Sequence, residues 1–156
     1  MEKIFSSEAL IRFSDCDPLG HLNNMRYLDY FLNAREDQLK EFANFDVYKH
    51  SKTTGQIWVM FQNQITYLRP VFYTNVVTIT SQVFKFSDKS IQVEMQMKDK
   101  KTGELKAVLW MIAVYIDMRA NKSVSHPTDI VEMINNIYLP LEQNSFEERV
   151  RFLQTK

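Results

Sequence analysis

Apolar side chains between residues 24 and 43 recur with the period of a helix. They comprise Leu28, Phe31, Leu32, Leu39 and Phe42. Separations of three, four and seven positions place such side chains on one helix face. Asn23 or Asn24 can cap the helix start. Arg35 falls within the apolar stripe, either with its charged end reaching water along the helix edge or as a paired, partly buried arginine.

Five other segments are rich in β-branched and aromatic residues, which favour strands. They cover about residues 4–13, 57–69, 75–87, 90–99 and 104–118. Apolar and polar residues alternate from Ile91 to Lys98, so we expect one face of that strand to meet water. From Leu105 to Met118 both faces are apolar, which indicates a strand covered on both sides. Short turns between the last three strands predict antiparallel pairing.

The C-terminal part of the chain reads as helical. Pro127 suits the first turn of a helix over about 127–137, and Ser145 with Glu148 fits a capping box at the start of a final helix. The order strand, helix and four strands predicts a single α+β domain over residues 1–156. Its core of about 4–118 would be a curved antiparallel sheet wrapped around the long helix, with a helical tail of about 125–156. We expect a subunit partner to cover the other sheet face and the sheet edges.

Composition narrows the class of protein. The chain has 156 residues, of which 45% are hydrophobic, and its 19 basic residues balance 19 acidic ones. No overall field therefore favours nucleic acid or an anionic membrane as a partner. Neither a signal-peptide apolar region nor an 18-residue apolar run is present, and there is one cysteine, which together predict a cytoplasmic protein. No zinc-type cluster, P-loop or Gly-x-Gly-x-x-Gly run is found, so we expect no metal or cofactor.

The segment from Asp17 to Asn24 carries the most specific chemistry. It reads Asp-Pro-Leu-Gly-His-Leu-Asn-Asn and joins a carboxylate, a turn and a helix start. A carboxylate can attack a carbonyl or activate water. Backbone N–H groups at a helix start can hold a developing oxyanion. Cys16 is an alternative nucleophile, but no base is adjacent to it in the sequence.

These residues resemble the 4-hydroxybenzoyl-CoA thioesterase family. The segments that carry the resemblance are Phe13–His21 with Tyr27, Tyr30 and Arg35; Tyr67–Pro70; and Ile116-Asp117 with His126-Pro127. The similarity spans roughly residues 4 to 137. It implies a hot-dog fold, a sheet wrapped around one helix, and hydrolysis of an acyl-CoA thioester. It also implies Asp17 as nucleophile or general base and the backbone N–H of Asn24 as the group that polarises the thioester carbonyl.

The same resemblance suggests further site residues. His21 would orient substrate or water, and His21-Leu22-Asn23-Asn24 is also similar to a run in acyl-ACP thioesterases. The carrier, CoA or ACP, therefore stays open, as does a non-catalytic acyl-CoA-binding module. The substrate-binding candidates are Gly20, Asn23, Tyr27, Asn63, Arg69, Lys85 and Lys89. Among them Tyr27 can instead pack in the helix, and the three basic residues would contact phosphates. Asn63 interrupts an otherwise apolar strand and would face either the site of a partner subunit or solvent. A homodimer or homotetramer is expected.

Overall fold

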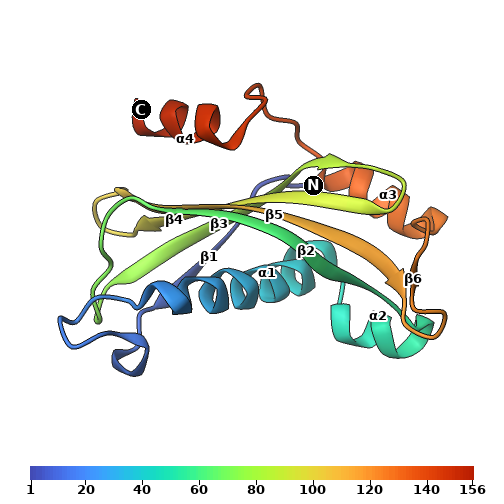
Figure 1. Cartoon of the computed structure of the whole chain (residues 1–156), viewed down its shortest axis with the longest axis horizontal. Helices are drawn as coiled ribbons and strands as arrows, with labels where there is room; N and C mark the ends of the chain where they lie inside the picture. Colours follow the sequence, from blue (N-terminus) through green and yellow to red (C-terminus); the bar gives the residue numbers. More distant parts are fainter.

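The computed structural model describes residues 1–156 and has an antiparallel sheet wrapped around one long helix, α1 (Tyr27–Ala43) (Figure 1). The long strands are β1 (Phe5–Leu10), β2 (Gln56–Tyr67), β3 (Val76–Phe86), β4 (Ser90–Asp99) and β5 (Leu105–Asp117). Their order in the sheet is β1-β3-β4-β5-β2, and the two-residue β6 (Lys122–Ser123) pairs with β5. The curved antiparallel sheet and the single α+β hot-dog domain are confirmed.

Helix α1 forms because its apolar stripe meets the concave face of the sheet. Phe31 and Leu39 are buried there against strand residues such as Met95 and Leu109. A short 3-10 turn (Asn24–Arg26) precedes α1, and the side chain of Asn23 accepts a hydrogen bond from the Met25 N–H. The helix ends at Asn44, whose left-handed backbone stops further helical bonding. The predicted helix is therefore confirmed, but Asn23 caps the 3-10 turn, and α1 itself follows Arg26 without a side-chain cap.

A second helix, α2 (Val47–Thr54), was not expected from the sequence. Asp46 caps its start by accepting a hydrogen bond from the Lys49 N–H, and Gly55 ends it in a left-handed conformation. The helix is eight residues long and mostly polar, so it shows no apolar stripe that periodicity could reveal. Its His50 pairs with the Tyr115 hydroxyl at 2.7 Å, which joins α2 to β5.

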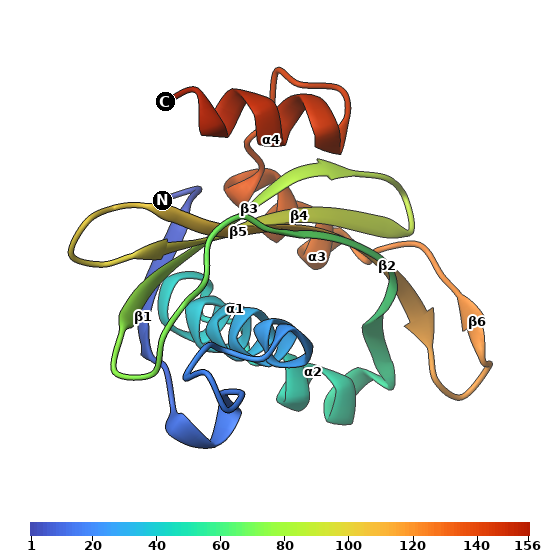
Figure 2. The same ribbon diagram turned by 60° about the vertical axis from the view of Figure 1, so that its left-hand side comes forward.

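Two helices form the C-terminal tail. Helix α3 (Thr128–Ile137) buries Ile130, Ile134 and Ile137 in the same core as α1. Helix α4 (Phe146–Gln154) lies on the opposite face of the sheet from α1 (Figures 1 and 2). Ser145 accepts a hydrogen bond from the Glu148 N–H at 3.2 Å, as the capping motif predicts. None of the helices combines the length and the apolar character that crossing a membrane requires.

Helix α4 overturns one expectation about β4. The polar face of this strand was expected to meet water, but Glu94 is 2% exposed and Gln96 9%. Arg149 of α4 donates from Nε to Glu94 Oε2 and from Nη2 to Glu94 Oε1, each at 2.8 Å. Trp110 and Gln96 each donate a further bond to the same carboxylate at 2.8 Å. Part of the sheet face that we expected a partner subunit to cover is thus covered by the chain itself. Strand β5 is covered on both faces, as predicted.

Strand β2 forms an open edge of the sheet. It pairs with β5 on one side only, and its register is interrupted by a bulge between Met60 and Gln62. All residues from Val59 to Gln64 are exposed, including Phe61 at 73%. A long edge strand with exposed apolar side chains is a site for pairing with another chain.

Candidate active site

The Asp17 side chain is fixed by its own turn. Its Oδ1 accepts hydrogen bonds from the backbone N–H of Leu19 at 2.9 Å and of His21 at 3.1 Å. Gly20, at φ +81°, closes the turn by donating its N–H to the Asp17 carbonyl at 2.9 Å. The other carboxylate oxygen, Oδ2, has no hydrogen-bond partner in the protein. Asp17 therefore caps the turn and also keeps one oxygen available for chemistry.

The loop that carries Asp17 is tied to the helix and to the segment after β2. The Leu22 N–H donates to the Val71 carbonyl at 2.6 Å. The Tyr30 hydroxyl of α1 donates to Asp15 Oδ2 at 2.5 Å. The backbone N–H of Asn24 donates to no group of the protein. A fixed loop thus presents a free carboxylate oxygen, and the helix start that follows presents an unused N–H.

A cavity of about 460 Å³ brings these groups together. It contains six of the residues that the sequence suggests: Asp17, His21, Asn23, Asn24, Tyr27 and Arg69. Tyr27 is only 2% exposed, so it packs in the core and also forms part of the cavity wall. The His21 ring packs edge-on against Phe72, with centroids 4.8 Å apart.

Tyr67 is a cavity residue that the sequence analysis did not assign to the site. Its hydroxyl donates to the Asn24 carbonyl at 3.1 Å, and its ring meets Tyr27 edge-on at 4.9 Å. It therefore holds the helix start against the end of β2. Leu68 and Pro70 complete that wall. The signal in the sequence that points to this residue is the run Tyr67–Pro70.

Four other candidates lie outside this cavity. Gly20 shapes the turn without lining the wall, and Asn63 lies exposed in the middle of β2. Lys85 and Lys89 lie at the other end of the sheet, where the Tyr115 N–H donates to the Lys89 carbonyl. Tyr67, which lines the cavity, pairs with Ala107 near the start of β5. Eight residues of strand, roughly 26 Å, separate these two ends.

Burial shifts the pKa values of three α1 side chains without changing their charge at pH 7. It raises the pKa of Tyr27 to about 12 and that of Tyr30 to about 12, so both phenols stay neutral well above neutral pH. Burial also lowers the pKa of Arg35 to about 10. Arg35 is 7% exposed and donates to Ser81 Oγ at 3.0 Å, with no carboxylate partner. It is thus neither a surface-reaching side chain nor an ion-paired one.

Cys16→Ser should leave most thioester hydrolysis intact. Burial, followed by the charges of Asp17 and Asp15, raises the pKa of the Cys16 thiol. The reactive thiolate is therefore scarcer at neutral pH than for an ordinary cysteine. Steady-state kcat and KM of wild type and variant test this expectation. A loss as large as that caused by Asp17→Asn would identify Cys16 as the nucleophile instead.

The sequence and the fold match proteins of known type. The long-chain acyl-CoA thioesterase FadM of Escherichia coli is 26% identical over 131 residues, which cover 84% of this chain and 97% of FadM. The DHNA-CoA thioesterase of Staphylococcus aureus superposes with a TM-score of 0.79 at 21% identity, over 88% of this chain and 91% of that chain. The 12:0-ACP thioesterase of Umbellularia californica superposes with a TM-score of 0.81 at 14% identity, over 93% and 54% of the two chains.

The two superpositions, at low identity, show a shared fold. The family assignment comes from the sequence itself. The model of the thioesterase-like superfamily matches residues 11–134, which include the Asp17 loop, α1 and the long strands β2 to β5. This chain therefore belongs to the thioesterase-like superfamily and is a thioester hydrolase.

Proposed function

We propose that the protein is an acyl-CoA thioesterase that releases a free acid and coenzyme A. The observation that carries the proposal is the pairing of an unbonded Asp17 oxygen with an unbonded Asn24 N–H in one cavity. The first group can supply a nucleophile or base, and the second can stabilise the carbonyl oxygen. The similarity to FadM, named as a long-chain acyl-CoA thioesterase, supports CoA as the carrier.

Two routes are compatible with this geometry. In the first, Asp17 Oδ2 attacks the thioester carbon, the C–S bond breaks, and water then hydrolyses the resulting anhydride. In the second, Asp17 takes a proton from a water molecule as its oxygen attacks the same carbon, and the C–S bond then breaks as the thiol leaves with that proton. In both routes the carbonyl oxygen gains negative charge and accepts a hydrogen bond from Asn24. His21, in the same wall, would orient the substrate or the water.

A panel of thioesters tests the function directly. We would measure thiol release from CoA thioesters of varied chain length and aromaticity, beside acyl-ACP thioesters with the same acyl groups. Faster turnover of the CoA series is expected. Preference for the ACP series would support an acyl-ACP thioesterase. Thermal stabilisation by acyl-CoA without turnover would instead identify a binding module.

We propose further that two copies pair through their β2 edges. The unpaired side of β2 and its exposed Val59, Met60 and Phe61 support this arrangement. Edge-to-edge pairing would satisfy the free backbone groups and cover these side chains. It would also bring Asn63 of each copy toward the other subunit, where it could contribute to the partner's site.

Phe61→Lys should dissociate the dimer, because it places a charge where the apolar edges would meet. Light scattering at micromolar concentration measures the change. Tyr48→Lys on α2 is the matched control, since Tyr48 is also well exposed, at 66% against 73% for Phe61. The control should keep the wild-type mass. A wild-type mass of 18.5 kDa, that of one chain, would exclude the proposed pairing.

A further inference from the structure

A second hollow lies on the sheet face opposite α1. Its volume is about 650 Å³, within the 300–1,000 Å³ common for ligand sites. Its floor is formed by β3 and β4, one side by the turn between β4 and β5, and its roof by the second half of α4. We call it the α4 groove. Helix α4 lies beyond residues 11–134, so the superfamily model does not include this roof.

The α4 groove adjoins the Asp17 cavity. Leu68 and Arg69 line both hollows. The N–H groups of Leu68 and Arg69 donate to the Lys106 carbonyl at 2.8 and 3.3 Å. Lys106 belongs to β5, and on the neighbouring strand β4 Lys98 pairs with Leu105 of β5. Arg69 and Lys98 are therefore about two strand spacings apart, roughly 10 Å. One extended ligand could occupy both hollows by passing Arg69.

The charges in the α4 groove suit an anion. Arg69, Lys98, Arg149 and Lys156 line it, and the only acidic side chain in the lining is that of Glu104. Glu104 is already paired with Lys106 at 2.6 Å, and Arg149 with Glu94 at 2.8 Å. Neither Arg69 nor Lys98 has a carboxylate partner, and the Lys156 ammonium rests on the Phe152 ring. Three cations thus face one hollow without a counter-ion in the protein.

We propose that the α4 groove holds the phosphates of coenzyme A while the thioester reaches Asp17. The inference rests on the proposed acyl-CoA thioesterase function. Coenzyme A joins a nucleotide bearing three phosphate groups to a thiol through a long flexible arm. The arm would pass Leu68 and Arg69, and the phosphates would meet Lys98 and Lys156. The C-terminal helix is then part of the substrate site and not merely a cover for the sheet.

The first test removes the two lysines. Lys98→Gln combined with Lys156→Gln should raise the KM for acyl-CoA about 10-fold, because charge-assisted contacts to phosphate are lost. The kcat should change little, since neither side chain lies in the Asp17 cavity. An acyl-pantetheine thioester, which lacks the nucleotide, should be hydrolysed equally well by variant and wild type. Unchanged KM for acyl-CoA, or an equal rise for both thioesters, would overturn the proposal.

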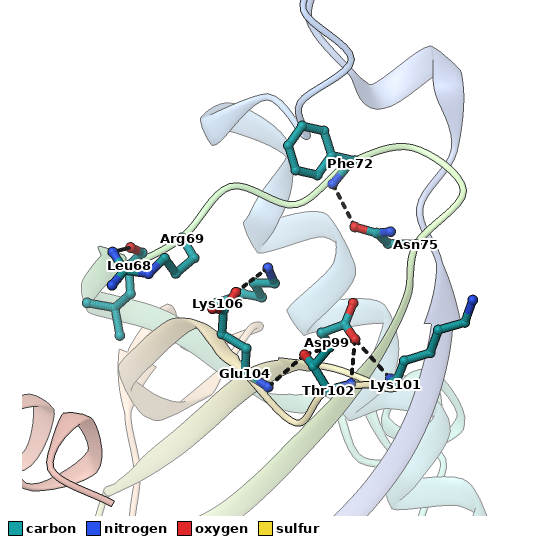
Figure 3. Close-up of polar contacts among 9 residues, drawn as sticks. All are labelled: Leu68, Arg69, Phe72, Asn75, Asp99, Lys101, Thr102, Glu104 and Lys106. Atoms are coloured by element: carbon teal, nitrogen blue, oxygen red, sulfur yellow. Dashed lines mark hydrogen bonds and ion pairs between the residues drawn. The ribbon is translucent and has the colours of Figure 1, made fainter.

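Lys101→Gln combined with Lys122→Gln is the matched control, because it also removes two positive charges. Lys101 belongs to the turn between β4 and β5 but does not line the groove, and its side chain points away from Arg69 (Figure 3). Lys122 is exposed on β6 and does not line the groove either. This control should keep the wild-type KM. An effect equal to that of the test variant would show that overall charge, not a binding site, explains the result.

Binding of 3′,5′-ADP separates this proposal from the proposed function. Calorimetry on the wild type should show binding that weakens about 10-fold in the double variant, whether or not any thioester is hydrolysed. Absence of binding to the wild type would contradict the groove proposal even if acyl-CoA turnover is found. A variant that loses activity only toward acyl-ACP would instead indicate that the groove receives the carrier protein.

Discussion

Arg149→Ala should lower the free energy of unfolding by about 3 kcal/mol, because it leaves the Glu94 charge buried without its partner. Glu94 has a side chain only 1% exposed, and Arg149 meets both of its oxygens at 2.8 Å. The same change should loosen α4 from the sheet, since Arg149 is its ion-pair link to β4. Urea unfolding measures the first effect. Trp110, which is 9% exposed beside Phe146 of α4, should report the second by a red shift in fluorescence.

Two variants make this result specific. Arg151→Ala changes an exposed residue of the same helix and should cost less than about 0.5 kcal/mol. Arg149→Met combined with Glu94→Gln removes both charges, so it should recover much of the stability lost in Arg149→Ala. A loss below about 1 kcal/mol in Arg149→Ala would mean that the pair contributes no more than a surface salt bridge.

Local periodicity was enough to identify most of the fold. The stripe of α1 and the runs of β-branched residues in β2 to β5 are properties of neighbouring residues, and all were found within a few positions of their ends. Helix α2 and β6 were missed because eight mostly polar residues and two residues carry no periodic signal. Their positions depend on tertiary contacts such as His50 with Tyr115.

The covering of β4 could not be predicted in the same way. The alternation of polar and apolar residues correctly separates its two faces, because side chains alternate along a strand. It does not reveal what covers the polar face. That face is buried by Arg149, which lies 55 residues after Glu94. An isolated strand sequence contains no sign of such a distant partner.

The candidate site, too, could be predicted only where its residues are close together in the sequence. Asp17, His21, Asn23 and Asn24 are close in sequence, and the structure gathers them in one cavity. Tyr67 joins them from 43 residues beyond Asn24, so only the fold brings it there. Lys85 and Lys89 lie elsewhere because β2 and β3 run in opposite directions, as the antiparallel pairs β2–β5, β5–β4 and β4–β3 require. The C-terminal ends of β2 and β3 therefore lie at opposite ends of the sheet.

Asp17→Asn should reduce kcat by about 100-fold or more, the range for loss of a general base. Asparagine has nearly the same size, and its carbonyl oxygen can still accept the hydrogen bonds of the Leu19 and His21 N–H groups. It lacks the negative charge needed to attack a carbonyl or to take a proton from water. Acyl-CoA should still bind, since the turn, the helix start and Arg69 are unchanged. Asp17→Ala is a poorer test, because it also removes the hydrogen bonds of the turn.

The most direct measurement is the kcat of purified wild type and Asp17→Asn for the best CoA thioester, at saturating substrate. Circular dichroism and gel filtration should coincide for the two proteins, so that a lost rate cannot be attributed to misfolding or dissociation. The account predicts a kcat ratio of about 100 or more with little change in acyl-CoA binding. A near wild-type kcat in Asp17→Asn would contradict it and would move the chemistry to His21 and Asn24.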